Sequence, residues 1–151
     1  MKKNILIIGG SSHVGKKIIS ELDCNNYNIY CTFNTTNLYN NKVKSFKVNL
    51  NNLHNVEKFI IEIKKLKIKI DSIIFLQGKI HAKNLSKYSN KDILELFNIN
   101  LMSSIILIRQ LHTALNKNST VVFISSISAV KGSYDSIYSA SKSALLGFSK
   151  S

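Results

Sequence analysis

Three side chains in the last third of the chain have the types and spacing for proton transfer at an oxygen atom. Tyr138 and Lys142 are four residues apart, so on a helix the lysine ammonium would lie beside the phenol. An ammonium stabilises a phenolate and lowers the pKa of a phenol from about 10 towards neutrality, where it can exchange protons. Ser126, twelve residues before Tyr138, follows an apolar run, and its hydroxyl could hold a carbonyl oxygen or alkoxide. The pattern predicts acid–base chemistry, although such a Tyr–Lys pair is also common on solvated helices.

A glycine-rich turn near the amino terminus is the second feature with chemical content. It follows the apolar run Ile5 to Ile8 and precedes a helical pattern. Glycines allow backbone N–H groups to approach a pyrophosphate, whose charge is stabilised at the helix N-terminus. The turn predicts dinucleotide binding, with a plain strand-to-helix turn as the alternative. Its residues are Gly9, Gly10, Ser11, Ser12, His13, Val14 and Gly15.

The segment after the second apolar run bears on which dinucleotide would bind. A carboxylate there would hold the 2′-hydroxyl of NAD, but Phe33 to Asn37, which includes Asn34, contains no acid. Lys16 or Lys17 could approach a 2′-phosphate. NADP(H) is therefore favoured over NAD(H).

Apolar runs and helical patterns alternate along the chain and must position these groups. Strands are expected at Asn4–Ile8, Asn28–Phe33, Lys44–Val48, Asp71–Leu76 and Thr120–Ile124. Helices are expected at Val14–Leu22, Val56–Ile70, Asp92–Leu115 (one long helix, with Leu94 on its buried side) and from Ile137 to the last residue. This order predicts an α/β fold with a Rossmann-like, doubly wound parallel sheet in three α/β/α layers, as a single domain over residues 1–151.

Composition excludes several classes of protein. The net charge is +13, but the lysines are scattered and Arg109 is the only arginine, so no nucleic-acid partner is expected; Lys64 to Lys69 is expected to be a solvated helix face. The first apolar run has four residues, too short for a secretory signal, and none approaches the roughly 18 of a membrane span. Cys24 and Cys31 lack metal-ligand spacing. We expect a cytoplasmic protein with no metal site and no membrane partner.

Together, the glycine turn, Asn100, Ser126 and the Tyr138–Lys142 pair resemble the short-chain dehydrogenase/reductase family, in its compact single-domain branch. The resemblance implies hydride transfer between NAD(P)H and a ketone or secondary alcohol. Tyr138 would be the acid or base, Ser126 would orient the carbonyl, and Lys142 would act on the tyrosine and hold the nicotinamide ribose. Asn100 would support a water in the proton relay. Asn49 would meet the adenine, Gly78 would lie over the adenosine ribose, and Leu50, next to Asn49, would also bind the cofactor.

The chain departs from the family pattern at several places. His13 stands at the middle glycine of the turn, Ile8 replaces a threonine, Phe75-Leu76-Gln77-Gly78 replaces Asn-Asn-Ala-Gly, and the Ser–Tyr loop is one residue shorter. Ser125 is an alternative carbonyl-holding serine if this shortening shifts the register. The strands that follow the last helix in the family are not present, so we expect the amino-terminal part of a longer protein, incomplete on the carboxyl-terminal side. A complete protein of this family is expected to be a homo-oligomer.

Three hypotheses follow. The first is an NAD(P)-dependent oxidoreductase that acts on a small-molecule ketone or alcohol through Ser126, Tyr138 and Lys142. The second is a non-catalytic NAD(P)-binding module without a complete substrate site. The third and weakest is a basic protein associated with nucleic acid, whose affinity would fall steeply with salt.

Overall fold

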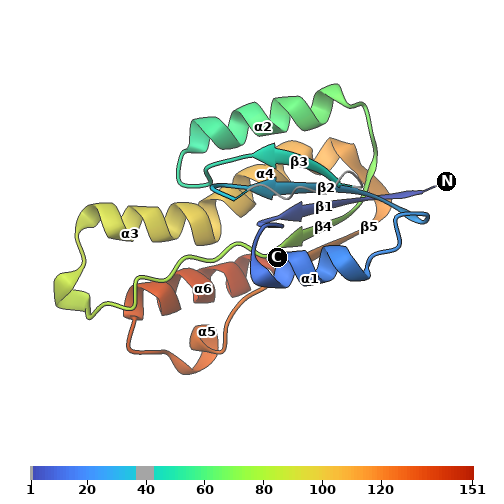
Figure 1. The fold of residues 1–151 in the computed structure, drawn as a ribbon. Helices are drawn as coiled ribbons and strands as arrows, with labels where there is room; N and C mark the ends of the chain where they lie inside the picture. Colours follow the sequence, from blue (N-terminus) through green and yellow to red (C-terminus); the bar gives the residue numbers. More distant parts are fainter. Residues whose placement is uncertain (1, 37–42) are drawn as a thin grey trace.

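The computed structural model describes residues 2–36 and 43–151, which form one parallel sheet with helices on both faces (Figure 1). The strand order is β3-β2-β1-β4-β5, and every neighbouring pair is parallel. The strands are β1 (Lys3–Ile8), β2 (Tyr27–Phe33), β3 (Val43–Lys47), β4 (Ile70–Phe75) and β5 (Leu115–Phe123). The predicted α/β Rossmann-like sheet is confirmed. Asn37, at the end of the acid-free segment, lies outside the described residues.

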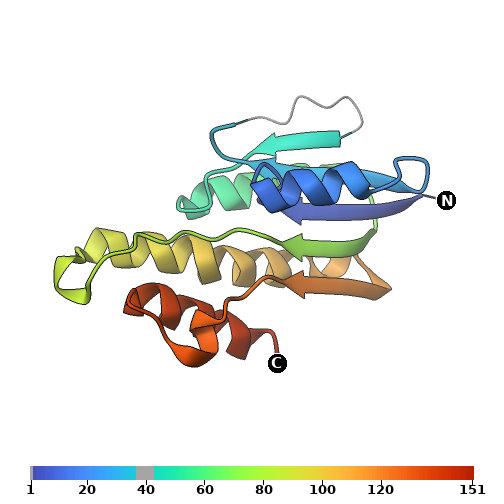
Figure 2. The ribbon, with the colours of Figure 1, turned by 60° about the horizontal axis from the view of Figure 1, so that its bottom comes forward.

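The α-helices cover the two faces of the sheet. Because β1 is apolar at every position from Ile5 to Ile8, its alternate side chains enter two separate cores. Ile5 and Ile7 pack in a cluster with Ile19 of α1, while Leu6 and Ile8 pack with α2 and α4. Figures 1 and 2 show α1 on one side of the sheet and α2 and α4 on the other. The α-helices are α1 (His13–Glu21), α2 (Leu53–Lys65), α3 (Asn90–Phe97), α4 (Ser103–Leu111), α5 (Ser128–Lys131) and α6 (Ser136–Phe148).

The single long helix predicted for Asp92–Leu115 is wrong, because the chain forms α3 and α4 with a π-helical turn, Asn98–Met102, between them. The π turn fits an extra residue into the helix and places Asn100 in the interior. Leu94 was expected on the buried face, yet it is 63% exposed, and Leu96 is buried instead. The apolar residues continue on both sides of the turn, so their period gives no sign of the interruption.

Three element boundaries also differ from the prediction. Strand β5 begins at Leu115 rather than Thr120, because its polar first half extends along β4, where Asn116 donates a hydrogen bond to Asp71 (2.6 Å). Helix α2 ends at Lys65 rather than Ile70, and Lys67 reverses the chain with a φ of 52°. Helix α6 ends at Phe148, capped by Ser149, and does not run to the last residue.

Helix α6 lies next to α3 and beyond the β5 edge of the sheet (Figure 2). The ring of Phe148 packs edge-on against Phe123 of β5, with ring centroids 5.8 Å apart. This contact places the carboxyl-terminal end of α6 beside the end of β5, and Lys142, in the middle of the helix, reaches the residues that follow β4 and β5. Within the described part of the chain, no helix is both long enough and apolar enough to cross a membrane.

Candidate active site

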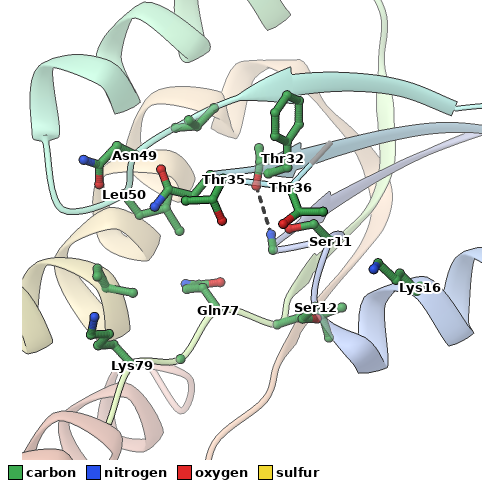
Figure 3. A pocket seen from close by; sticks show the side chains of 17 residues that line it. Ser11, Ser12, Lys16, Thr32, Thr35, Thr36, Asn49, Leu50, Gln77 and Lys79 are labelled. Carbon is green, nitrogen blue, oxygen red and sulfur yellow. Dashed lines mark hydrogen bonds between the residues drawn. The ribbon is translucent and has the colours of Figure 1, made fainter. Parts of the chain in front are cut away.

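A pocket of about 350 Å³ lies at the carboxyl ends of the central strands (Figure 3). It lies between β1 and β4, where the strand order changes direction along the sheet. Open α/β sheets bind ligands at this kind of switch point. Seven of the residues predicted to bind a cofactor line the pocket. They are Gly9, Ser11, Ser12, Asn34, Asn49, Leu50 and Gly78.

The geometry of the glycine turn explains its sequence. Gly9 has a φ of 84°, and a Cβ there would stand 3.1 Å from the backbone nitrogen of Gln77. Ser12 caps α1 by accepting a hydrogen bond from the Gly15 N–H (3.0 Å). A Cβ on Gly15 would stand 2.5 Å from the carbonyl oxygen of Gly10, so only glycine lets α1 pack against the turn.

Not every predicted cofactor residue lines this pocket. His13 and Val14 are exposed at the start of α1, and Gly15 is buried behind the turn. Tyr138 and Lys142 lie on α6, outside the lining of the pocket. The pocket therefore corresponds to the turn and adenosine side of the predicted site.

The lining residues carry positive charge and hydroxyl groups. Among the lining residues that the structure describes, Lys16 and Lys79 are the charged members, and none is Asp or Glu. Thr35 and Thr36 follow β2 at the rim, where the sequence lacks an acid (Figure 3). Lys17, the other lysine considered for a 2′-phosphate, pairs instead with Glu21 one helical turn later.

Lys142 links three elements beside the pocket. Its side chain is almost fully buried, and its Nζ donates to the carbonyl oxygens of Ile124 (2.9 Å) and Gln77 (3.3 Å). Burial lowers the pKa of this amine from its ordinary value. A Cβ on Gly78 would stand 3.5 Å from the Nζ, so the amine lies next to the edge of the pocket.

Tyr138 and the two candidate serines lie near the same end of the sheet. Among residues 2–36 and 43–151, the Tyr138 hydroxyl makes no hydrogen bond. The Ser126 Oγ accepts from the Ser128 N–H (3.1 Å), which leaves its own proton free to donate. The Ser125 Oγ donates to the backbone carbonyl of Lys142 (3.2 Å), so that hydroxyl proton is already used.

Asn100 is buried and fixes the segment that follows the pocket. Its Oδ1 accepts from the Lys79 N–H (2.7 Å), and its Nδ2 donates to the Lys79 carbonyl (2.9 Å) and to the Ser141 Oγ (2.9 Å). The side chain thus joins the π-helical turn, the end of the pocket and α6. This is a bracing arrangement, and its contact on α6, Ser141, is the residue directly before Lys142.

Two lining residues, Gln77 and Thr32, have structural roles that the sequence pattern did not indicate. Gln77 donates from its Nε2 to the Ser104 Oγ (2.6 Å), which ties the end of β4 to α4. Thr32 of β2 accepts from the Gly9 N–H (2.9 Å) and so holds the turn, although Ile8 lacks the hydroxyl usual in the family. Both residues lie at strand ends next to the turn, and that position was the available signal.

Comparison with known proteins agrees with this geometry. The family model for short chain dehydrogenases matches residues 3–151, and the chain belongs to this family. No curated protein sequence matches the chain significantly. Among solved structures, a short chain dehydrogenase family protein from Francisella tularensis superposes with a TM-score of 0.92 at 22% identity over 99% of this chain.

Two further solved structures show the same fold at low identity. A short chain dehydrogenase/reductase from Saccharomyces cerevisiae gives a TM-score of 0.84 at 24% identity over 97% of this chain. ElxO with NADP bound gives 0.82 at 22% over 98%. The chain spans 62% of the length of the Francisella and yeast proteins and 65% of ElxO. The likeness therefore establishes the fold.

Proposed function

We propose that this chain forms the cofactor-binding and proton-transfer part of an NAD(P)-dependent oxidoreductase that interconverts a ketone and a secondary alcohol. The observation that carries the proposal is the position of Lys142. Its buried amine donates to the carbonyl oxygens of Gln77 and Ile124, which follow β4 and β5, beside the glycine-lined pocket. A dinucleotide suits this pocket for two reasons. Gly9 has no Cβ, which leaves space beside Gln77 for the ligand, and the N-terminus of α1 can stabilise the negative charge of a pyrophosphate.

Each side chain has a distinct part in the proposed chemistry. When bound, the nicotinamide supplies or accepts the hydride. Tyr138 gives a proton to the substrate oxygen, or takes one from it, and the Lys142 ammonium stabilises the phenolate. The Ser126 hydroxyl donates a hydrogen bond to the same oxygen. Ser126 is preferred over Ser125 because the Ser125 hydroxyl already donates to the backbone carbonyl of Lys142. Asn100 holds the Lys79 backbone and thereby the end of the pocket.

We propose NADP(H) as the preferred cofactor. Within residues 2–36 and 43–151, the pocket lining has two lysines and no carboxylate, so these residues attract a 2′-phosphate and none of them repels it. Of the two lysines, Lys16 in the first turn of α1 is closer in sequence to the glycine turn than Lys79 is. Thr35 and Thr36 add hydroxyl donors at the rim of the pocket. ElxO, which has the same fold, has been solved with NADP bound, and this is consistent with the proposed preference.

We also propose that the protein is a homo-oligomer and is located in the cytoplasm. Leu94 of α3 and Met102 of the π-helical turn are exposed apolar side chains, which supports a homo-oligomer formed through these helices. Cys24 and Cys31 are free thiols, which supports the proposed cytoplasmic location. Light scattering coupled to gel filtration tests the oligomer, with Leu94→Lys as the variant expected to weaken it.

The central test combines binding and turnover. Binding is followed by NADPH and NADH fluorescence, and turnover at 340 nm with an acetoacetyl thioester, ethyl acetoacetate and a ketose sugar. Tyr138→Phe is expected to lower turnover by at least 100-fold, because it removes the transferable proton, and to leave NADPH affinity within twofold. Tyr134→Phe is the matched control, because Tyr134 is 71% exposed four residues earlier. Equal turnover by wild type and Tyr138→Phe would contradict the assigned chemistry.

The same data distinguish the second candidate, a non-catalytic dinucleotide-binding module. That candidate is favoured by the exposure of Ile127, Val130 and Tyr134 around the reactive groups. It predicts NADPH binding by wild type with no turnover of any of the three substrates. Salt-sensitive binding to nucleic acid with no response to NADPH would instead support the third hypothesis.

A further inference from the structure

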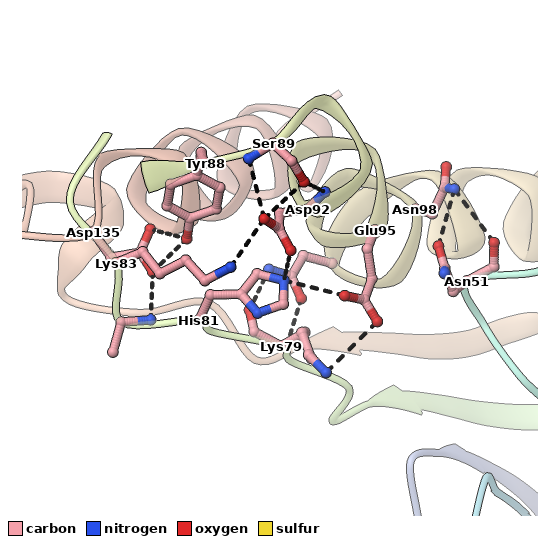
Figure 4. A network of polar contacts seen from close by, with 12 residues as sticks. Asn51, Lys79, His81, Lys83, Tyr88, Ser89, Asp92, Glu95, Asn98 and Asp135 are labelled. Atoms are coloured by element: carbon pink, nitrogen blue, oxygen red, sulfur yellow. Dashed lines mark hydrogen bonds and ion pairs between the residues drawn. The ribbon is translucent and has the colours of Figure 1, made fainter. Parts of the chain in front are cut away.

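Asp135 is a buried carboxylate, 3% exposed, that joins two distant parts of the chain (Figure 4). Its Oδ1 accepts from the Tyr138 N–H (2.9 Å) and so caps α6. Its Oδ2 accepts from the Ala82 N–H (2.9 Å), and the Tyr88 hydroxyl donates to the carboxylate at 2.7 Å. The carboxylate therefore connects the first turn of α6 to the 79–88 segment, which leads from the pocket to α3.

Capping alone does not require this residue. One oxygen from Ser, Thr or Asn satisfies the N–H groups at a helix start, and a charged carboxylate is costly to bury. Burial raises the pKa of Asp135, but donation from Tyr138, Tyr88 and Ala82 outweighs it, and the pKa lies below its usual value. For Tyr88, burial and the adjacent carboxylate raise the pKa, so its proton stays on the phenol. The connection is thus a charged acceptor surrounded by neutral donors.

The other side of the 79–88 segment is held by α3. Lys83 pairs with Asp92 (2.9 Å), and His81 Nε2 and Lys79 Nζ lie 3.1 and 3.6 Å from the carboxylate of Glu95 (Figure 4). His81, Asp92 and Glu95 are close enough to share a metal ion, but the two lysines already neutralise these carboxylates. The backbone of Lys79 is fixed by Asn100. Asn100 also reaches α6 through Ser141, and Asp135 adds a second link, from the Ala82–Tyr88 end of the segment to the first turn of α6.

We infer that Asp135 is a positioning residue: it fixes the first turn of α6, and with it Tyr138, relative to the segment that leaves the cofactor pocket. This inference rests on the proposed function, since Tyr138 must meet a substrate placed by that pocket. Small displacements of a reacting group lower the rate far more than they lower binding. Loss of the link is therefore expected to reduce kcat and to spare cofactor affinity.

Two variants cut the link and keep the helix cap. Asp135→Ser retains a capping hydroxyl that is too short to reach Ala82 and Tyr88. Tyr88→Phe removes one donor from the other side. Ser139→Ala is the matched control, because its Oγ bonds to the Asp135 carbonyl and to Ser133, in the same helical turn but outside the link. Each is assayed for kcat and KM with ethyl acetoacetate, for NADPH affinity, and for the urea midpoint.

The expected result is a kcat about tenfold lower in Asp135→Ser and about threefold lower in Tyr88→Phe, with NADPH affinity within twofold in both. Ser139→Ala is expected to lower the urea midpoint as much as Tyr88→Phe does, with kcat unchanged. The combined Asp135→Ser/Tyr88→Phe variant is expected to have the same kcat as Asp135→Ser, because both substitutions remove the hydrogen bond between Tyr88 and Asp135.

Three outcomes would overturn the inference. One is an unchanged kcat in Asp135→Ser while Tyr138→Phe is inactive, which leaves the proposed function in place. Another is a kcat in Ser139→Ala that falls in step with its stability, which would make the effect of Asp135 merely structural. A wild type that binds no dinucleotide and reduces none of the substrates would remove the proposed function first and this role with it.

Discussion

The two halves of the candidate site are built differently. The nucleotide half is enclosed by the ends of β1, β2, β3 and β4. Hydrogen bonds from neighbouring strands hold the residues that follow β1, β3 and β4, at Gly9, Val48 and Leu76. The reactive half stands at the edge strand β5, and its surroundings are apolar and exposed. Ile124, Ile127, Val130 and Tyr134 have exposures of 45–73%.

The difference between the two halves shows that the described residues form a shaped pocket for the nucleotide but cover the reactive groups only partly. The turn, Lys16 and the strand ends form a shaped pocket, and Lys142 is in a buried, bonded position. Ser126 and Tyr138, by contrast, are only partly covered, and their hydroxyl protons are free. We therefore expect substitutions in the nucleotide half to change folding and binding, and substitutions in the reactive half to change turnover.

The largest effect on folding is expected from Gly15→Val. The new Cβ would stand 2.5 Å from the Gly10 carbonyl oxygen, and backbone cannot move aside cheaply. The unfolding free energy should fall by about 3 kcal/mol, near the upper end for overpacked sites, as measured by urea denaturation. Gly147→Ala is the control, because a Cβ there meets nothing within 4 Å. Equal stability of the two variants would show that the turn is not tightly packed.

A smaller and pH-dependent effect is expected from Asp135→Asn. At pH 7 the loss of the charged acceptor should lower the unfolding free energy by about 2 kcal/mol. The pKa of Asp135 is lowered in the folded state, so its stabilisation is present above pH about 4 and is lost as the pH falls through the lowered pKa. The urea curves of wild type and variant should therefore converge below pH 4, and a gap that stayed constant with pH would refute the role of the charge.

The smallest effect is expected from Lys16→Ala, which tests cofactor choice within the nucleotide half. NADPH affinity should fall about fivefold, because an exposed ammonium contributes only modestly to a phosphate contact, while NADH affinity should stay within twofold. Lys17→Ala is the matched control, since Lys17 is engaged with Glu21. A parallel loss for both cofactors would place Lys16 at the pyrophosphate rather than at a 2′-phosphate.

The local features of the fold could be predicted from the sequence. The run from Ile5 to Ile8 and the turn to Gly15 are short and self-contained, so the first strand, the turn and the start of α1 follow from residue types alone. The same holds for the Tyr138–Lys142 spacing on α6. These features depend on residues within one turn or strand of each other.

The remaining features depend on contacts between distant residues. The π turn at Asn98–Met102 accompanies the bonds between Asn100 and Lys79, which no helical period reveals. The polar start of β5 is a strand only because it pairs with β4. The cap at Asp135 could have been found from an acidic residue before a helical pattern, but its bonds to Ala82 and Tyr88 could not.

The most direct measurement is the change in backbone amide NMR shifts when NADPH is added to the uniformly ¹⁵N-labelled chain. We predict that the largest changes fall at the lining residues Gly9, Ser12 and Gly78 and extend to Lys142 on α6. No change, or changes confined to the lysine-rich face of α2, would contradict the assignment of this pocket to a nicotinamide dinucleotide.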